Sequence, residues 1–439
     1  MRINLIKPPE CSRMNFGCFS LAVLASAVRD IASIKIIDAT NLTIEEAVSA
    51  AVKDTPDLIG VTTMGLASVG PAKTFLRALR SAGFNGLLIT GGHGASMSPK
   101  VLLESGADAV VCGEGEITFR ELLQRGISEK VSGLYLQRDG ALIKTPQRPL
   151  IQSLDSLQEP ARDLAGEPPD GIFLLETSRG CPHGCTFCET TRFHGRRWRA
   201  RSPGLVAEDI RHLVSSHGAV IIQIADDNFM ASPERAQRIC ESLRDGPLPL
   251  FFLFSARSDD MLRHPEIIAS LSTARFLRAT IGVETVNPEL AQSIRKTITF
   301  EQHKKAFAAL REAGIFTVAS FIVGLPGETE EMRSCYLDTA VDIGADAARF
   351  LPFQPLPGTP MESGTGEPEP LCAEYAVRLT REFERHITVL NRLIEASEKP
   401  DVRGMLARAS LHRRLRENIL DVCNAAMVQK KLLELEFNS

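Results

Sequence analysis

The chain has 439 residues, which exceeds one typical domain and is enough for two or three. Lys and Arg number 50 and Asp and Glu number 54, so the formal net charge is −4 and a nucleic-acid partner is not indicated. Lys7, Pro8 and Pro9 interrupt any signal-peptide core, and no apolar run approaches the roughly 20 residues that cross a bilayer. We therefore expect a cytoplasmic protein with no membrane contact.

Residues 1–125 alternate short β-rich runs with helical patterns. A capping box at Thr43–Glu46 precedes apolar residues at helix spacing, and strands that alternate with helices favour a parallel sheet. We predict a doubly wound, Rossmann-like α/β domain over 1–125. Its strands are expected at Ile3–Ile6, Ile34–Ile37, Leu58–Thr62, Leu87–Thr90 and Ala109–Val111.

The segments that follow three of these strands are rich in glycine and hydroxyl residues. They are Thr62–Gly65, Gly91–Gly94 and Gly113–Gly115. Ligands of open α/β folds bind at the carboxyl edge of the sheet, and glycine there lets a bulky ligand approach the backbone. This edge is the predicted ligand site of the first domain.

Residues 126–171 lose the periodicity, and we expect a small hairpin around Arg138–Gly140 and then a linker. A second series of strands and helices predicts a partial (βα)6 TIM barrel over 172–365, with its chemistry at the carboxyl ends of the strands. Its strands are expected at Ile172–Glu176, Val220–Ala225, Leu250–Phe254, Ala279–Val283, Thr317–Val323 and Ala347–Phe353. Residues 366–439 are expected to form a short helical C-terminal region.

Three of the ten cysteines, Cys181, Cys185 and Cys188, have C-x3-C-x2-C spacing. Three thiolates on a short loop can hold three irons of a cubane and leave the fourth iron open to a small ligand. Structural zinc is an alternative, but it usually takes four ligands, so His183 or His194 would have to complete the set. Accidental clustering is the remaining alternative.

With Phe187 just before the third cysteine, this motif resembles the signature of the radical SAM superfamily, and the match covers about residues 172–360. The resemblance implies that the three thiolates hold a [4Fe–4S] cluster and that S-adenosylmethionine (SAM) binds its open iron and is cleaved to a 5′-deoxyadenosyl radical. It also implies a set of candidate cofactor contacts beside the cluster, and a structural role is the alternative for each polar one. They are Phe187, Asp226, Asp227, Ser255, Arg257 and Glu284, with Gly324 and Pro326 near the adenine.

Residues 1–125 resemble the cobalamin-binding domain that precedes the radical SAM barrel in one large subfamily, the class B radical SAM methyltransferases. The positions carried over as cofactor contacts are Thr62, Thr63, Gly91, Gly92, His93, Gly113, Glu114 and Gly115. Pro8–Ser12 stands where other cobalamin proteins have D-x-H-x-x-G, so the resemblance implies no histidine ligand on the lower face of cobalt. His93 as a cobalt ligand and a cofactor-free regulatory sheet are alternatives.

Together, the two cofactors imply methyl transfer to an unactivated carbon of a small molecule or biosynthetic intermediate. One SAM would methylate cobalamin, and a second would supply the radical, with electrons from a partner such as flavodoxin or ferredoxin. No catalytic side chain is assigned beyond the cluster ligands. The alternatives are a radical cyclase or ring-rearrangement enzyme, a non-catalytic cobalamin or redox sensor, and an electron-transfer ferredoxin, which would need a fourth cysteine.

Overall fold

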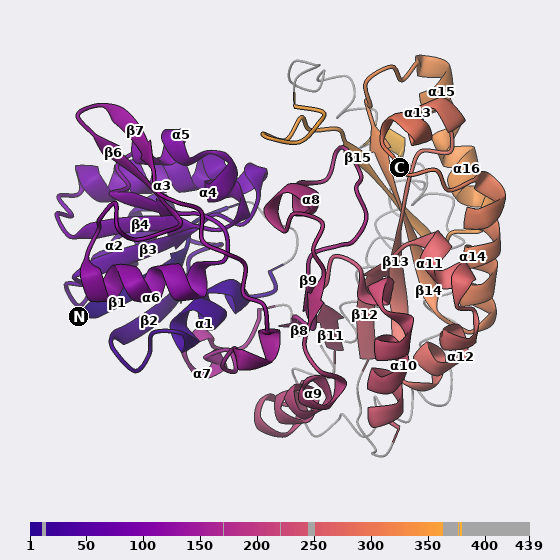
Figure 1. The fold of residues 1–439 in the computed structure, drawn as a ribbon, viewed down its shortest axis with the longest axis horizontal. Coiled ribbons are helices and arrows are strands. Elements are labelled where there is room, and N and C mark those ends of the chain that lie inside the picture. Colours follow the sequence, from indigo (N-terminus) through magenta and orange to yellow (C-terminus); the bar gives the residue numbers. More distant parts are fainter. Residues whose placement is uncertain are drawn as a thin grey trace, which may run out of the picture. The chain divides into compact units, whose positions relative to one another are not determined.

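The computed structural model of this chain describes residues 1–10, 15–169, 171–219, 221–244, 251–362, 376, 378 and 379. The chain divides into two compact units, Met1–Asp170 and Gly171–Ser439 (Figure 1). Apart from positions 376, 378 and 379, the helical region expected over 366–439 lies outside the described residues. Within the described residues, no helix combines the length and the apolar character needed to cross a membrane.

The first unit contains one sheet in the strand order β2-β1-β3-β4-β5-β6-β7. The five predicted strands are present and parallel, and β6 and β7 add an antiparallel hairpin. The strands are β1 (Arg2–Lys7), β2 (Ser33–Asp38), β3 (Leu58–Thr62), β4 (Leu87–Gly91), β5 (Ala109–Val111), β6 (Leu134–Arg138) and β7 (Ala141–Lys144). The helices are α1 (Phe19–Ser26), α2 (Ile44–Val52), η1 (Leu66–Ser68), α3 (Val69–Ser81), α4 (His93–Met97), α5 (Pro99–Leu103), α6 (Gly115–Arg125), η2 (Leu154–Ser156) and α7 (Arg162–Ala165).

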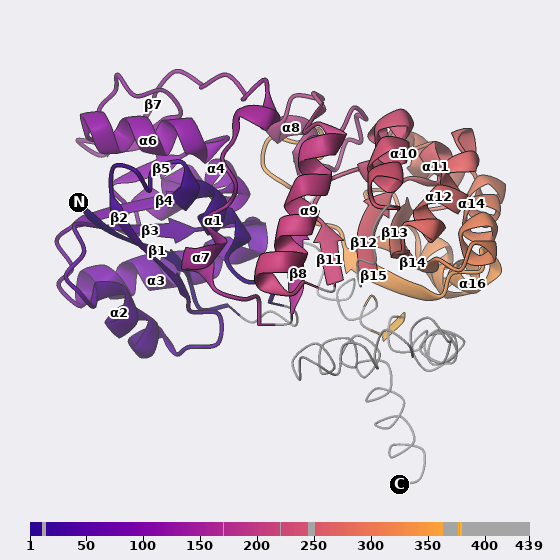
Figure 2. The same ribbon diagram turned by 90° about the horizontal axis from the view of Figure 1, so that it is seen from below.

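Helices cover both faces of this sheet, which confirms the doubly wound fold. Alternate strand residues point to opposite faces. Ile59 and Val61 pack in one core with α2 and α3, whereas Leu5 packs in another with α1 and α6. Figure 2 shows α6 on one side of the strands and α2 and α3 on the other. The predicted capping box is also present, because the backbone N–H of Glu46 donates to Thr43 and the reverse bond forms as well.

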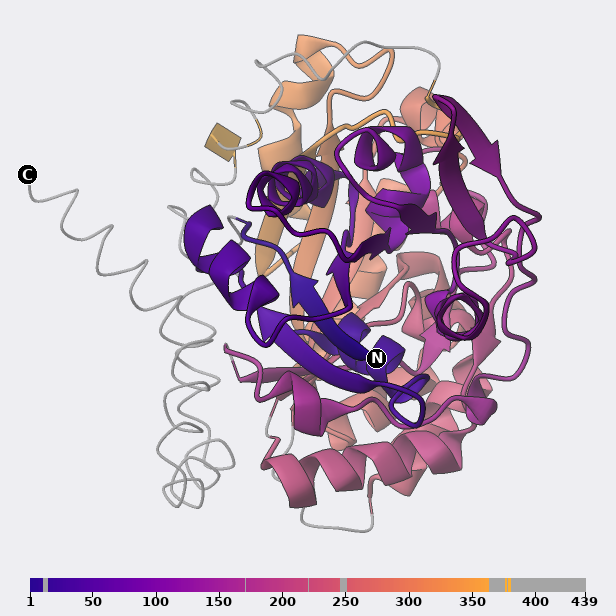
Figure 3. The same cartoon turned by 90° about the vertical axis from the view of Figure 1, so that its left-hand side faces the viewer.

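The expected hairpin is present, but it belongs to the sheet of the first unit. Asp139 and Gly140 have φ values of 52° and 77°, and a two-residue type I′ turn requires positive φ at both positions. Strand β6 pairs with β5 and covers the edge that β5 would otherwise expose. Figure 3 shows the hairpin at one end of the sheet and the indigo first strands at the other. The first unit therefore continues to Asp170, through residues expected to form a linker after position 125.

The second unit contains six parallel strands in the order β15-β14-β13-β12-β11-β8, which confirms the expected six-strand partial barrel. These strands are β8 (Ile172–Leu175), β11 (Ile221–Ile224), β12 (Phe251–Ala256), β13 (Phe276–Glu284), β14 (Phe316–Val323) and β15 (Ala347–Pro352). A separate antiparallel ladder joins β9 (Ser178–Arg179) to β10 (Arg199–Ala200). The helices are α8 (Glu189–Phe193), α9 (Pro203–His217), η3 (Phe229–Ala231), α10 (Pro233–Ser242), α11 (Ser258–Arg263), α12 (Glu266–Thr273), α13 (Pro288–Ser293), α14 (Phe300–Glu312), α15 (Glu330–Ser334) and α16 (Tyr336–Asp342).

One apolar core lies between the six strands and helices α9, α10, α12, α14 and α16. Phe254, Ile281 and Phe321 are fully buried members of it from β12, β13 and β14. Figure 1 shows α10, α12, α14 and α16 on one side of these strands. The opposite side of the strands is called the inner face below, and alternate strand residues point to it.

Candidate functional site

The cysteine motif lies on the loop between β9 and α8. Cys181, Cys185 and Cys188 are free thiols; Cys185 is buried and the other two are partly buried. Cys188 is the N-cap residue of α8. Gly180 has φ 85°, and a Cβ added there would collide with the backbone carbonyl oxygen of Arg197. Glycine is therefore required directly before the first cysteine.

Asp226, just after β11, holds the chain that leads into this loop. Its two carboxylate oxygens accept hydrogen bonds from the backbone N–H and hydroxyl groups of Thr177 and Ser178, at 2.5 to 2.9 Å. Burial raises the pKa of this carboxyl, although the hydrogen bonds oppose the rise. Asp226 was expected near SAM, but both oxygens are occupied by the chain before the motif. Its observed contacts position the loop.

Asp227 ties together the two ends of the cysteine loop. Its Oδ2 accepts a hydrogen bond from the Gly180 N–H at 3.1 Å, and its Oδ1 accepts one from the Thr190 hydroxyl at 2.8 Å. Gly180 precedes the first cysteine and Thr190 follows the third. One carboxylate thus fixes both sides of the segment that carries the three thiols.

The middle of the loop is attached to α13 and to a small apolar cluster. The Thr186 N–H donates to Ile294 O at 3.2 Å, and the Thr186 hydroxyl donates to Ser293 O at 3.1 Å. Phe187 packs against the cluster that contains Leu325 from the loop after β14. The aromatic residue of the motif therefore anchors the third cysteine.

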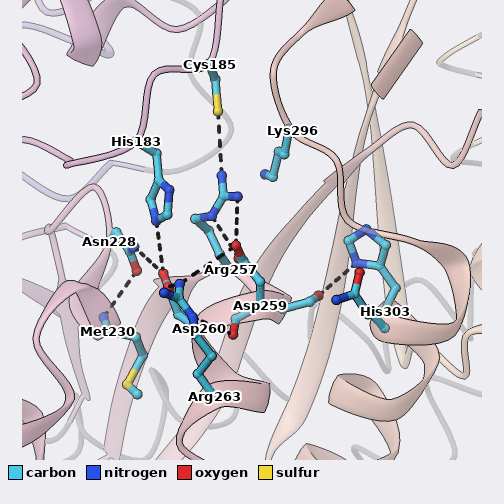
Figure 4. A network of polar contacts seen from close by, with 12 residues as sticks. His183, Cys185, Asn228, Met230, Arg257, Asp259, Asp260, Arg263, Lys296 and His303 are labelled. Atoms are coloured by element: carbon cyan, nitrogen blue, oxygen red, sulfur yellow. Dashed lines mark hydrogen bonds and ion pairs between the residues drawn. The ribbon is translucent and has the colours of Figure 1, made fainter. Parts of the chain in front are cut away.

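Arg257, after β12, reaches the cysteine loop. Its Nε and Nη2 donate to the carboxylate of Asp259 at 2.9 and 3.1 Å, and its Nη1 donates to Cys185 Sγ at 3.6 Å (Figure 4). The bidentate pair fixes the guanidinium plane. The structure thus brings Arg257 and Cys185 into contact, which puts a positive charge beside one thiol. Ser255 lies two residues earlier, on the inner face of β12.

A second carboxylate of α11, Asp260, also reaches the loop. Its Oδ2 lies 3.4 Å from His183 Nε2 and accepts a hydrogen bond from Asn228 Nδ2 at 2.6 Å (Figure 4). Arg263 pairs with its other oxygen. This network links the loop to the ends of β11 and β12. Neither aspartate of α11 was predicted, although both lie within three residues of the predicted Arg257.

The zinc alternative needs a fourth ligand beside the three thiols. His183 is engaged with Asp260, and His194 Nδ1 lies 3.0 Å from Arg199 Nη2. Throughout the described ranges, no three His, Cys, Asp or Glu side chains are placed to hold a single metal ion. A cubane has a different requirement, because each thiolate binds its own iron. Three free thiols on one braced loop fit that donor set.

Burial raises the pKa of the Cys181 thiol to about 11, and the nearby Cys188 and Asp227 add to the rise. Burial also raises the pKa of Cys188. Both thiols are therefore protonated at neutral pH without a metal. Only the thiolate binds iron, so cluster assembly must release these protons.

Glu284 ends β13 in a backbone conformation that side chains rarely adopt. Its φ is 62°, and the ladder to β14 shifts register between Gly282 and Glu284. Lys296 Nζ donates to Glu284 Oε1 at 2.7 Å, and both side chains are buried. A Cβ added at Gly282 would collide with both charged groups. Local strain beside a buried ion pair is typical of functional sites. Lys296 was not predicted from the sequence.

The loop after β14 is held by Glu328. Its carboxylate accepts hydrogen bonds from the Gly324 N–H at 2.5 Å and from the Tyr336 hydroxyl at 2.5 Å. Gly324 has φ 88°, which favours glycine. Pro326 is partly buried in the same loop. The segment expected near the adenine therefore has a fixed backbone shape.

In the first unit, the loops after β3 and β4 pack backbone to backbone. The Thr63 N–H donates to Gly91 O at 2.8 Å, and the Gly94 N–H donates to Thr63 O at 3.0 Å. A Cβ added at Gly92 would collide with the Thr63 carbonyl, and one at Gly94 with the Gly65 carbonyl. These glycines were expected to admit a ligand, but the structure requires Gly92 for contact between the two loops.

Room for a ligand remains at the same edge. A Cβ added at Gly65 or Gly113 would meet nothing within 4 Å, so backbone at these points can approach a bulky corrin. Glu114, expected as a cofactor contact, accepts a hydrogen bond from the Ile151 N–H at 2.6 Å and anchors the chain after the hairpin. The other expected contacts also lie along this edge: Thr62 at the end of β3, Gly91 at the end of β4, His93 at the start of α4 and Gly115 at the start of α6.

Comparison with known families and proteins agrees with both units. The radical SAM superfamily profile matches residues 175–338, and the B12 binding domain profile matches residues 17–123. An uncharacterized methyltransferase of Pyrococcus horikoshii is 31% identical over 82% of this chain and 82% of its own length. The anaerobic magnesium-protoporphyrin IX monomethyl ester cyclase of Rubrivivax gelatinosus is 29% identical over 69% of this chain and 57% of its own.

The radical SAM methyltransferase TsrM of Kitasatospora setae has the same fold. Its structure with cobalamin and a [4Fe–4S] cluster has a TM-score of 0.69 and 20% identity, over 87% of this chain and 81% of that one. Its structure with tryptophan and a SAM analogue has a TM-score of 0.70, over 87% and 83%. The predicted cofactors, a [4Fe–4S] cluster, SAM and cobalamin, are confirmed for the family. The chain belongs to the radical SAM superfamily, among the cobalamin-dependent enzymes that carry a B12-binding domain.

Proposed function

We propose that this chain is a methyltransferase that acts on an unactivated carbon of a small molecule. The observation that carries the proposal is the braced loop with three free thiols, in a chain that also has a B12-binding domain. When bound, the cluster with SAM supplies a hydrogen-abstracting radical, and cobalamin carries the methyl group. The chain itself binds the cofactors and positions the substrate carbon for the reaction.

The side chains around the loop suggest how SAM is held. Glu284 offers a buried carboxylate to the amino group of SAM, and Lys296 offers a cation to its carboxylate. If the Glu284–Lys296 ion pair opened when SAM binds, each side chain would exchange its contact with the other for an ionic contact with SAM. Arg257, donating to Cys185, would stabilise the negative charge on a cluster ligand. The loop at Gly324 offers backbone groups to the adenine.

Radical cyclisation is the second candidate, because cyclases are among the similar proteins. Both reactions would cleave SAM to 5′-deoxyadenosine. Only methyl transfer would also convert SAM to S-adenosylhomocysteine. The ratio of the two products therefore decides between them.

The test uses the full chain reconstituted with iron, sulfide and cobalamin without oxygen, with dithionite as reductant. We expect 5′-deoxyadenosine and S-adenosylhomocysteine, measured by liquid chromatography, from the wild type. Cys185→Ala should give neither product. Cys335→Ala, at an exposed thiol on the helix side of the second unit, should give both at the wild-type rate. Equal turnover in the wild type and Cys185→Ala would refute the proposal.

A low-potential protein such as flavodoxin or ferredoxin would be the reductant in the cell. Replacement of dithionite by reduced flavodoxin in the same assay tests this partner. Product formation at a rate that saturates with flavodoxin concentration is the expected result. A rate no greater than that without any reductant would exclude this partner.

A further inference from the structure

Two arginines lie on the inner face of the six-stranded sheet. Ala279 of β13 and Phe350 of β15 belong to the core beneath the helices. Because successive strand residues point to opposite faces, their neighbours Arg278 and Arg349 point to the inner face. Neither arginine was singled out in the sequence, and neither belongs to the site around the cysteine loop.

Arg278 is held in place with part of its hydrogen-bonding capacity unused. Leu253 of β12 pairs in register with Gln223 on one neighbouring strand and with Arg278 on the other. Arg278 Nη2 donates a hydrogen bond to Gln223 Oε1 at 3.1 Å, so the arginine side chain extends across Leu253. Gln223 Nε2 donates to Ile224 O at 2.8 Å, which leaves the amide oxygen for the arginine. The Nε of Arg278 is buried and has no partner among the described residues.

The charge of Arg278 is not balanced by an acidic side chain in the described part of the protein. Burial lowers its pKa to about 10, and the positive charge of Arg349 adds to the lowering. Arg349 is exposed, and it makes no hydrogen bond or ion pair with any described residue. Two like charges near each other repel, and a buried unpaired donor is costly, so an anion between them would relieve both penalties.

An apolar strip leads from these arginines toward the cysteine loop. Leu351 is the next inner-face residue of β15 after Arg349, and it is 51% exposed. It pairs in register with Ile322 of β14, which lies in the small apolar cluster against which Phe187 packs. On the inner face, the cationic side chains of Arg278 and Arg349 thus lie farther from the cysteine loop than the apolar residues Leu351 and Ile322.

We infer that Arg278 and Arg349 bind the anionic end, a carboxylate or phosphate, of a substrate whose apolar body lies along Leu351 and Ile322 toward the cysteine loop. The planar guanidinium group matches either anion. This inference rests on the proposed function, because it takes the inner face as the place of the substrate. It narrows the substrate class to amphiphilic acids.

The test is chemical protection of Arg349 in the reconstituted full-length holoenzyme. Phenylglyoxal modifies accessible arginines, and mass spectrometry of peptides gives the rate at each one. Separate samples contain sodium octanoate, sodium acetate or inorganic phosphate at equal ionic strength. Arg238, exposed on α10, is the internal control in every sample.

Octanoate should slow modification of Arg349 about threefold at twice its dissociation constant, because the rate falls by 1 + [L]/Kd. Acetate and phosphate should need a roughly tenfold or greater concentration for the same protection, because they bury no alkyl chain. Arg238 should react at an unchanged rate throughout. The anion site would be overturned if octanoate did not slow the modification of Arg349, or if it slowed that of Arg238 equally. If acetate protected Arg349 at the same concentration as octanoate, the proposed apolar contact of the substrate with Leu351 and Ile322 would be overturned.

The product assay on the same preparation separates this inference from the proposed function. If the holoenzyme makes 5′-deoxyadenosine while Arg349 stays unprotected, only the anion site fails. If Arg349 is protected by octanoate while no 5′-deoxyadenosine forms, the radical function fails and the anion site stands.

Discussion

Asp226→Ala should release the cysteine loop from its support. Asp226 is 4% exposed and accepts four hydrogen bonds from Thr177 and Ser178. Alanine leaves two buried backbone N–H groups and two hydroxyls without this acceptor. Each orphaned N–H costs about 1–3 kcal/mol, so the free energy of unfolding should fall by about 2–6 kcal/mol. The cluster should assemble poorly as well, because these residues lead directly into the motif.

Asp226→Asn is the matched control. Its amide oxygen can accept from both N–H groups, and its NH2 can donate to both hydroxyl oxygens, so all four contacts can persist. Burial raises the pKa of the Asp226 carboxyl, which means that the site already disfavours the charged form. Loss of the charge-assisted bonds should therefore cost no more than about 1.5 kcal/mol.

Urea unfolding of the metal-free proteins gives the stability difference, and iron and sulfide analysis after reconstitution gives the cluster content. Calorimetry then measures SAM affinity. The asparagine variant should match the wild type in iron and in SAM affinity, and the alanine variant should lose iron. Full iron content in the alanine variant would refute the positioning role. Normal iron with weakened SAM binding in the asparagine variant would instead place the carboxylate on the cofactor.

Three further predictions concern other parts of the chain. Gly92→Ala should lower the melting temperature of the cobalamin-free chain and weaken cobalamin binding, because its Cβ collides with a neighbouring loop. Gly65→Ala meets open space in the chain itself, so it should leave that melting temperature unchanged and weaken only cobalamin binding; calorimetry measures both effects. Burial lowers the pKa of His303 to about 3, so below pH 6.5 this residue gains a proton in the unfolded chain but not in the folded chain. Between pH 7 and pH 5, urea titrations should therefore show that the free energy of unfolding falls by about 2 kcal/mol more in the wild type than in His303→Gln. Arg257→Gln removes a positive charge beside Cys185, so the reduction potential of the cluster should fall by on the order of 50 mV. Redox titration monitored by EPR measures this potential, and an unchanged or higher value would contradict the stabilising role of Arg257.

The fold could be predicted from the sequence because local patterns of apolar and turn residues mark its strands. Each predicted strand is a short apolar run between turn or cap signals, and the six strand ends of the second unit were located to within three residues. The hairpin was also found from Arg138–Gly140. Its membership of the first sheet was not, because pairing of β6 with β5 is a contact distant in sequence that leaves no periodic signal.

The sequence predicted the cysteine motif of the candidate site, but not the contacts that hold the motif's loop in place. The motif at Cys181–Cys188 is compact in sequence, and thus visible. The sequence predicts Asp226 and Gly92 as cofactor contacts, and it does not show that both also hold a neighbouring loop, because carboxylates and glycines serve ligands and backbone packing equally well. Whether such a residue contacts a ligand or a backbone depends on which atoms of the neighbouring loop lie against it. Lys296 follows a short helix without any motif, so only its contact with Glu284 identifies it.

The three thiols lie on a loop outside the regular strands and helices, so residues elsewhere must set their positions. Asp227 follows β11, Arg257 follows β12, and Thr186 bonds to the end of α13, the helix after β13. The carboxyl ends of parallel strands share one edge, so contacts from three successive units meet at one loop. A site is most precise when rigid elements support it. Substitutions at these contacts should therefore reduce cluster content before they unfold the barrel, whereas substitutions in the core beneath the helices should do both together.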